Sequence, residues 1–279
     1  MKCFQLVKTV LDELYVRIPA SSEAEKDSKI GAMLRKLEQN YAHLVYENNV
    51  DHSDLVSRFA YIYKYVTCHA NLVSQTIAES DDLGTLFNRE KVNVTCIGGG
   101  PGSDFLGILK YLLLNQKSPF LRCTLYDREG GWGDCWNDVD EKLDPQMRIS
   151  TFCQPADVTD VASWSVNIKY LNSDLFTMIY FLSELDSKKS SAEPFFLNRL
   201  QQAQPGALLL YIDNNHSQFY NWYDELVTRF PIEILLSREG SMRINDYTEE
   251  KTDLAKYWDK FGFPKLTADV AIRVCKKLS

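Results

Sequence analysis

The sequence predicts an α/β protein, in which an N-terminal helical domain over residues 1–90 precedes a mostly parallel seven-stranded sheet over residues 91–279. Two observations lead to this prediction. Before residue 91, apolar residues recur at the three- and four-residue spacing of amphipathic helices. After it, short and continuously apolar runs alternate with helical segments, which is typical of strands buried on both faces.

The N-terminal part is predicted to be helical from the spacing of its apolar residues. Phe4, Val7, Leu11 and Leu14 recur every three or four positions from the start of the chain. The segment 55–78 is apolar around much of its circumference, so we expect it to be buried against another layer. An aromatic stripe in this segment is interpreted as core rather than as substrate contacts: Phe59, Tyr61, Tyr63 and Tyr65.

Seven strands are predicted after residue 91, each a short apolar run bounded by turn residues. They span residues 92–97, 121–126, 148–153, 176–182, 207–212, 232–237 and 269–275. Helical spacing separates several of them, at residues 105–114, 192–204 and 218–229. Helices between parallel strands cover both faces of a sheet, so we expect a layer of helices on each side.

Composition and charge exclude several classes of protein. Apolar residues make up 45% and charged residues 25% of the 279 residues, which is ordinary for a globular protein. The 38 acidic residues outnumber the 31 Lys and Arg residues, giving a net charge of -7, so the charge does not indicate a nucleic-acid partner. The longest apolar runs, at 176–182 and 207–212, are far shorter than the ~20 residues that cross a membrane. We therefore expect no membrane association.

The cysteine and histidine residues form no recognisable metal or disulfide pattern. The seven cysteines are scattered without a C-x-x-C pair, and the four histidines lie far apart. We therefore expect no metal site and no disulfide framework. Because the N-terminus also has no signal-peptide pattern, an intracellular location, cytoplasmic or nuclear, is predicted.

Residues 94–104 carry the strongest functional signal. Four glycines, Gly98, Gly99, Gly100 and Gly102, lie between a predicted strand and a predicted helix. Glycine lets the backbone turn tightly and approach a ligand with no Cβ in the way. The N-terminus of the following helix offers free N–H groups and the positive end of its dipole to an anion. The segment is a candidate nucleotide loop, although a plain strand-to-helix turn would use the same residues.

Two nucleotide cofactors are compatible with this loop. The NAD(P) fingerprint needs a third glycine where the chain has Ser103. The pattern Gly98-x-Gly100-x-Gly102 resembles motif I of class I S-adenosylmethionine (SAM)-dependent methyltransferases, whose fold is Rossmann-like. Asp127, at the end of the second predicted strand, suits either cofactor because a carboxylate there can bind both ribose hydroxyls.

The resemblance to class I methyltransferases extends over residues 91–279 and implies further site residues. It places Asp157 and Val158, after the third strand, at the adenine of SAM. It also implies that residues 181–185, at the end of the fourth strand, face the methyl acceptor. The last two strands would form the terminal hairpin of that family.

Two departures from the family pattern bear on the function. Cys96 occupies the position where motif I usually has an acidic residue, and Asp104 is expected to take over the contact with the methionine amine of the cofactor. The N-P-P-Y-type motif of amino-group methyltransferases is missing after the fourth strand. Its absence disfavours the exocyclic amines of nucleic acids as acceptors.

Methyl transfer from SAM mainly requires that the acceptor is held in line, so the family has no universal catalytic residue. Glu184 and His216 are the candidates here. Glu184 either faces the acceptor or caps a turn, and His216 is either a base or an exposed turn residue. Trp132 either walls the adenine pocket or packs against the next helix.

The predicted function is that of a SAM-dependent methyltransferase whose acceptor is a small molecule or a protein. The alternative is a catalytically inactive SAM-binding protein with a regulatory or scaffolding role. An NAD(P) oxidoreductase is disfavoured by Ser103 and by the lack of a hydride-transfer constellation.

Overall fold

Within the described residues, seven strands form one sheet in the order β3-β2-β1-β4-β5-β7-β6. The computed structural model describes residues 3–42, 51–136, 148–166, 172–243 and 251–279. Adjacent strands are parallel except at β7, which runs antiparallel to both β5 and β6. The strands are β1 (Lys91–Ile97), β2 (Phe120–Asp127), β3 (Ile149–Pro155), β4 (Leu175–Ile179), β5 (Leu208–Asn214), β6 (Ile232–Arg243) and β7 (Thr267–Lys277). The predicted α/β class with a mostly parallel seven-stranded sheet is confirmed.

Each predicted strand is present with somewhat different bounds; β4 is shorter and β6 is much longer than predicted. β4 ends at Ile179, three residues earlier than predicted, because Tyr180 has a φ of 54° and turns the chain out of the sheet. β6 continues to Arg243 because its second half still pairs with β7. The early end of β4 leaves Glu184 in the segment beyond the carboxyl edge of the sheet, where ligands bind in open α/β folds.

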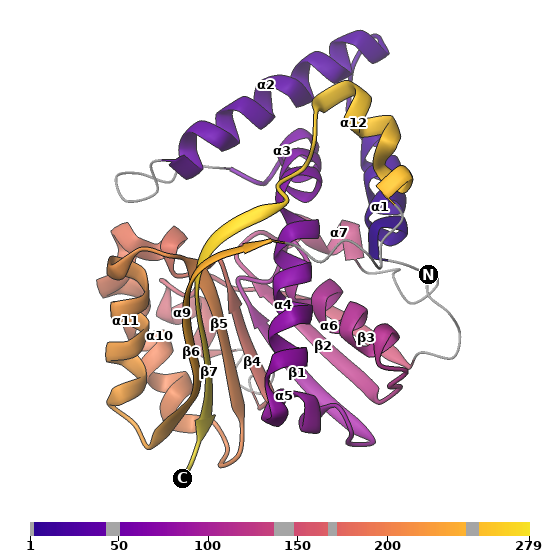
Figure 1. Ribbon diagram of the computed structural model, residues 1–279. Coiled ribbons are helices and arrows are strands. Elements are labelled where there is room, and N and C mark those ends of the chain that lie inside the picture. Colours follow the sequence, from indigo (N-terminus) through magenta and orange to yellow (C-terminus); the bar gives the residue numbers. More distant parts are fainter. Residues whose placement is uncertain (1–2, 43–50, 137–147, 167–171, 244–250) are drawn as a thin grey trace.

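Helices cover both faces of the sheet (Figure 1): α4 and α6 pack on one face, and α10 and α11 on the other. The helices are α1 (Cys3–Arg17), α2 (Glu23–Ala42), α3 (Leu55–Tyr61), α4 (Thr67–Glu79), α5 (Asp81–Leu86), α6 (Ser103–Leu114), α7 (Gly133–Trp136), α9 (Val161–Ser165), α10 (Lys189–Gln202), α11 (Ser217–Thr228) and α12 (Ala255–Phe261). The shorter turns are the π-helical η1 (Ile62–Val66) and the 3-10 helices η2 (Gly130–Trp132), η4 (Ser183–Lys188) and η5 (Lys251–Leu254). No helix in the described part of the chain is long and apolar enough to cross a membrane.

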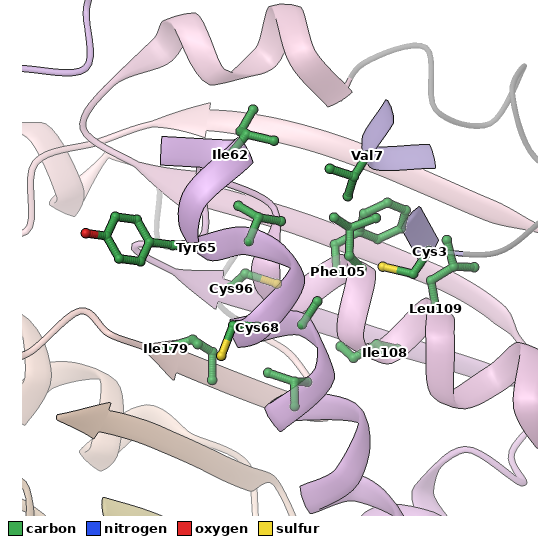
Figure 2. Packing of buried hydrophobic residues seen from close by; sticks show 14 of the residues in the cluster. Cys3, Val7, Ile62, Tyr65, Cys68, Cys96, Phe105, Ile108, Leu109 and Ile179 are labelled. Atoms are coloured by element: carbon green, nitrogen blue, oxygen red, sulfur yellow. The ribbon is translucent and has the colours of Figure 1, made fainter. Parts of the chain in front are cut away.

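Buried apolar side chains form two clusters, one on each face of the sheet. The first joins α1, α4 and α6 to the sheet, and Figure 2 shows Val7, Cys68 and Phe105 among its members. The second joins α10 and α11 to strand residues such as Phe176 and Tyr211. Because both faces are covered, the central strands must be apolar on both sides, which explains their continuous apolar runs.

The N-terminal helices share the first of these cores with the sheet. α4 approaches α6 so closely that a Cβ at Gly107 would lie 2.5 Å from the backbone oxygen of Ala70. The missing side chain of Gly107 therefore allows the two helices to touch. The division into two domains at residue 90 stays a prediction, and this contact lies across the proposed boundary.

α12, from the segment before β7, lies beside the N-terminal helices α1 and α2 (Figure 1). The hydroxyl of Tyr257 donates to Oδ1 of Asp12 at 2.5 Å, and Nζ of Lys260 pairs with Asp27 at 2.8 Å. These contacts fix α1 and α2 relative to the C-terminal part of the chain.

Candidate functional site

A cavity opens at the carboxyl edge of the sheet, where the segments after four neighbouring strands meet. Gly98 follows β1, Asp127 ends β2, Asp157 lies after β3 and Phe181 lies after β4, and all four line the cavity. Residues from before α3, from α3 itself, from η2 and from η4 complete the wall, among them His52, Tyr61, Trp132 and Glu184. The strand order thus brings together segments that are far apart in the sequence.

The glycine loop after β1 packs under two aromatic side chains. Gly98 has a φ of 70°, and a Cβ there would lie 2.1 Å from Cδ2 of Phe181. A Cβ at Gly100 would lie 2.1 Å from Cδ1 of Trp132. Side chains at either position would therefore collide with the wall of the cavity itself.

Two further glycines of the loop lie against the protein interior. A Cβ at Gly99 would lie 2.3 Å from the Cβ of Cys96, and one at Gly102 would lie 2.5 Å from Cε2 of Trp136. Of the four predicted glycines, Gly98 alone lines the cavity. The other three glycines allow the loop to pack closely against neighbouring side chains.

Asp127 joins the glycine loop to the end of β2. Its Oδ2 accepts a hydrogen bond from the N–H of Gly100 at 3.0 Å, and its Oδ1 accepts one from the N–H of Glu129 at 2.9 Å. Burial raises the pKa of Asp127 to about 6, although both hydrogen bonds favour the charged form. Each carboxylate oxygen has two lone pairs, so both retain capacity to accept from a diol in the cavity.

Asp157 and Val158 lie in the turn after β3, and both line the cavity. Oδ1 of Asp157 accepts hydrogen bonds from the N–H of Thr159 at 2.8 Å and from its hydroxyl at 2.7 Å. Burial opposes ionisation, but these hydrogen bonds hold the pKa of Asp157 below its usual value. The carboxylate is therefore charged at neutral pH and can accept from an amino group.

Asp104 lies outside the cavity wall. It is buried in the first turn of α6, where the hydroxyl of Thr177 on β4 donates to its Oδ2. Burial raises the pKa of Asp104 to about 7. The expected contact with the methionine amine of a cofactor stays a prediction.

The two catalytic candidates lie in different places. Glu184 lines the cavity, and the hydroxyl of Tyr41 donates to its Oε1 at 2.9 Å. Burial raises the pKa of Glu184 to about 8, and the nearby carboxylates act in the same direction. His216 lies outside the cavity wall and caps α11, since its Nδ1 accepts from the N–H of Gln218 at 3.3 Å. Of the two, Glu184 is the one that lines the cavity.

Tyr61 is buried in the core, as predicted, and it also lines the cavity. Phe59 and Tyr63 of the same stripe do pack in the interior, against Tyr257. The π-helical η1 begins directly after Tyr61 and changes the helical phase, so the α-helical spacing does not identify the face that meets the cavity. His52 and Tyr180 also line the cavity and have no signal in the sequence.

The topology decides the fold class at this point. The sheet has the order β3-β2-β1-β4-β5-β7-β6. It is mostly parallel, ends in the antiparallel pair β7-β6 and carries its glycine loop after β1, as the sequence resemblance implies. The chain has the class I methyltransferase fold. Among the described residues of this methyltransferase fold, no cluster of His, Cys, Asp or Glu is arranged to hold a metal ion.

No protein-family model and no curated protein matches the chain. Several solved structures do resemble this methyltransferase fold. The mitomycin 7-O-methyltransferase MmcR is 13% identical over 88% of this chain and 67% of its own, with a TM-score of 0.48. The 16S rRNA methylase ArmA is 12% identical over 88% and 98%, with a TM-score of 0.46. The [4+2]-cyclase SpnF is 13% identical over 94% and 98%, with a TM-score of 0.45.

Proposed function

We propose that this protein is a SAM-dependent methyltransferase whose cofactor occupies the cavity at the carboxyl edge of the sheet. The observation that carries the proposal is that one cavity gathers Gly98, Asp127, Asp157 and Val158 from the ends of three strands. These are the positions at which the sequence resemblance places the loop, ribose and adenine contacts of SAM.

The chemistry of the donors and acceptors fits that cofactor. The two oxygens of Asp127 suit the two ribose hydroxyls, since charge-assisted hydrogen bonds are stronger than neutral ones. The charged Asp157 suits the adenine amino group. The side-chain-free surface at Gly98 and the ring of Phe181 allow close approach of the adenosine.

The bound cofactor supplies an electrophilic methyl group on a sulfonium. The residues of the chain bind the acceptor, orient it toward that methyl group and exclude water. The rings of Tyr61 and Trp132 form an apolar wall for this purpose. Glu184 lies on the same wall and can hold a proton that the acceptor loses.

The charge of the wall supports a small-molecule or protein acceptor over a nucleic acid. Its carboxylates outnumber its cations among the described residues, and a polyanion would be repelled. The lining carboxylates are Asp51, Asp127, Glu129, Asp157 and Glu184, and the lining cations are Arg128 and Lys188.

Calorimetry with SAM and with S-adenosylhomocysteine (SAH) tests the proposal. We expect saturable binding to the wild-type chain and to His216→Ala, which alters a helix cap outside the cavity. We expect much weaker binding to Asp157→Ala. Absence of binding to the wild-type chain at millimolar ligand would remove the proposal.

A catalytically inactive SAM-binding protein is the second candidate. Two observations favour it. Cys96 stands where motif I usually has an acidic residue, and Asp104, which was expected to replace that residue, is buried against Thr177. Binding of SAM without SAH formation over a broad set of acceptors would support this candidate.

A further inference from the structure

Glu184 lies on the cavity wall at the point where the N-terminal helices meet the segment after β4. The hydroxyl of Tyr41, from the end of α2, donates to its Oε1 at 2.9 Å. Among the described residues, Glu184 accepts this hydrogen bond and forms no ion pair. A half-buried carboxylate without a cationic partner is costly, so a site that keeps one is suited to a cation from outside.

Aromatic rings adjoin this carboxylate. The ring of Tyr41 lies 6.0 Å from that of Tyr61, and the ring of Tyr61 lies 6.1 Å from that of Trp132, each measured between centroids. The ring of His52 lies 5.1 Å from Tyr61, and burial lowers the pKa of His52 to about 4, so it carries no positive charge at neutral pH. Faces of tyrosine and tryptophan rings attract ammonium groups within ~6 Å of the ring centroid.

The remaining charges of the wall are acidic on balance. Asp127 and Asp157 have partners in the proposed cofactor, which leaves the carboxylates of Asp51, Glu129 and Glu184 beside two cations, Arg128 and Lys188. Arg128 acts on Glu184 by lowering its pKa, but it forms no ion pair with it among the described residues. A small cation would therefore gain both a carboxylate and aromatic faces at one place.

Building on the proposed function, we infer that the methyl acceptor is an aliphatic amine, which enters as its ammonium ion and binds between Glu184 and the rings of Tyr41, Tyr61 and Trp132. The ammonium group first passes one proton to the Glu184 carboxylate. The lone pair of the neutral amine then forms a bond to the methyl carbon of SAM, while the bond from that carbon to sulfur breaks and its electron pair stays on sulfur. The products are the N-methylated ammonium ion and SAH, and Glu184 releases its proton to solvent.

The raised pKa of Glu184, about 8, supports this role. A carboxylate with an ordinary pKa is a poor base toward an ammonium ion. A higher carboxyl pKa brings it closer to the pKa of the ammonium group, so proton transfer becomes less unfavourable. The same aromatic wall that attracts the ammonium group also keeps water from the reacting atoms.

The first experiment measures binding and does not depend on turnover. The SAH complex of the full chain is titrated with n-butylammonium and with n-butanol, its neutral counterpart, by calorimetry at pH 9, where Glu184 is ionised and most of the amine is still charged. We expect n-butylammonium to bind at least ~10-fold more tightly. Glu184→Gln should remove most of this preference, and Glu225→Gln, on the exposed surface of α11, should keep it.

A second pair of variants tests whether the aromatic ring of Tyr61 contributes to ammonium binding apart from any effect on the fold. Tyr61→Phe keeps the aromatic ring and should keep the preference for n-butylammonium, whereas Tyr61→Leu should reduce it ~3-fold to 30-fold. Equal binding of n-butanol and n-butylammonium to a chain that still binds SAH would overturn the amine inference while leaving the proposed function intact. Failure to bind SAM and SAH would instead contradict the proposed function.

Turnover assays then identify the source of the amine. SAH formation is measured with n-butylamine and, separately, with a short lysine-containing peptide and its acetyl-lysine counterpart. Methylation of n-butylamine alone indicates a small-molecule acceptor, and a strong preference for the lysine peptide indicates a protein acceptor. Methylation of an alcohol or thiol probe in place of both amines would overturn the inference.

Discussion

The hydroxyl of Tyr41 donates a hydrogen bond of 2.9 Å to Glu184, across 143 positions of sequence. This contact joins the end of α2 to the segment after β4, whose Glu184 lines the cavity. It places the end of α2 next to the cavity wall. It also links the charge state of Glu184 to the position of α2.

Activity toward an amine should rise with pH through about 8, the pKa of Glu184, because the carboxylate must be ionised to accept a proton. Its surroundings act in both directions: burial and the carboxylates of Asp127 and Asp213 raise the pKa, whereas Tyr41 and Arg128 lower it. Tyr41→Phe removes a donor to the charged form and should move the rising limb to higher pH. A profile of kcat/KM that is identical in both proteins would contradict the assignment of that limb to Glu184.

Asp127→Ala should weaken SAM binding by ~10-fold to 100-fold, through loss of charge-assisted hydrogen bonds to the ribose. Asp127→Asn should lose less, because one oxygen acceptor remains. Both variants should also lower the melting temperature of the free protein, since Asp127 accepts hydrogen bonds from Gly100 and Glu129. A lowered melting temperature with unchanged SAM affinity would leave Asp127 as a structural residue only.

Gly100→Val should destabilise the fold as well as abolish SAM binding. Binding should be lost because the new side chain would enter the space expected for the cofactor. Stability should be lost because its Cβ would lie 2.1 Å from Cδ1 of Trp132. Overpacking of this kind costs ~1–3 kcal/mol. Thermal denaturation of Gly100→Val, Trp132→Ala and the double variant checks the cause, because removal of the indole should recover part of the stability. Strictly additive losses would show that the collision with Trp132 is not responsible.

The free protein should lose stability as pH rises from about 4 to 7 through the ionisation of Asp104. Its folded pKa of about 7 lies above the usual value of 3.8, so the native state binds more protons than the unfolded state across this interval. The stabilisation is complete below the unfolded pKa and is lost as pH rises through the folded pKa. Asp104→Asn cannot ionise and keeps an oxygen for Thr177, so its melting temperature should fall less between pH 5 and pH 8. A fall equal to that of the wild type would rule out this carboxyl as the cause.

A fragment of residues 89–279 should aggregate or fail to fold, because it exposes the face of α6 that α4 covers. Phe105 and Ile108 are fully buried in that interface region, and Gly107 lies against Ala70 of α4. Size-exclusion chromatography and circular dichroism of the fragment, with the full chain as the control, provide the measurement. A monomeric, folded fragment that binds SAM would establish residues 1–88 as a dispensable domain.

Much of the sheet and part of the cavity wall could be predicted from local patterns. Short apolar runs bounded by turn residues indicate strands, because successive side chains of a strand point to opposite faces and a strand that is buried on both faces is apolar throughout. Glycines between a strand and a helix, and acids at strand ends, are informative because parallel strands bring their carboxyl ends to one edge. Gly98 and Asp127 were identified in this way, Asp157 and Glu184 were identified by the resemblance to class I methyltransferases, and the structure brings all four to one cavity.

Other contacts at the cavity depended on tertiary structure. Tyr61 lines the cavity, and Tyr41 donates a hydrogen bond to Glu184 on its wall. The spacing of apolar residues within α2 and α3 does not predict either contact, because both depend on how these helices pack against the segment after β4. Asp104 and His216 have residue types suited to a site, but packing against Thr177 and capping of α11 place them elsewhere. The sequence by itself determined the order of strands and helices, because that order follows from short-range spacing. The tertiary structure decided which side chains share the cavity, because that depends on contacts between residues more than a hundred positions apart.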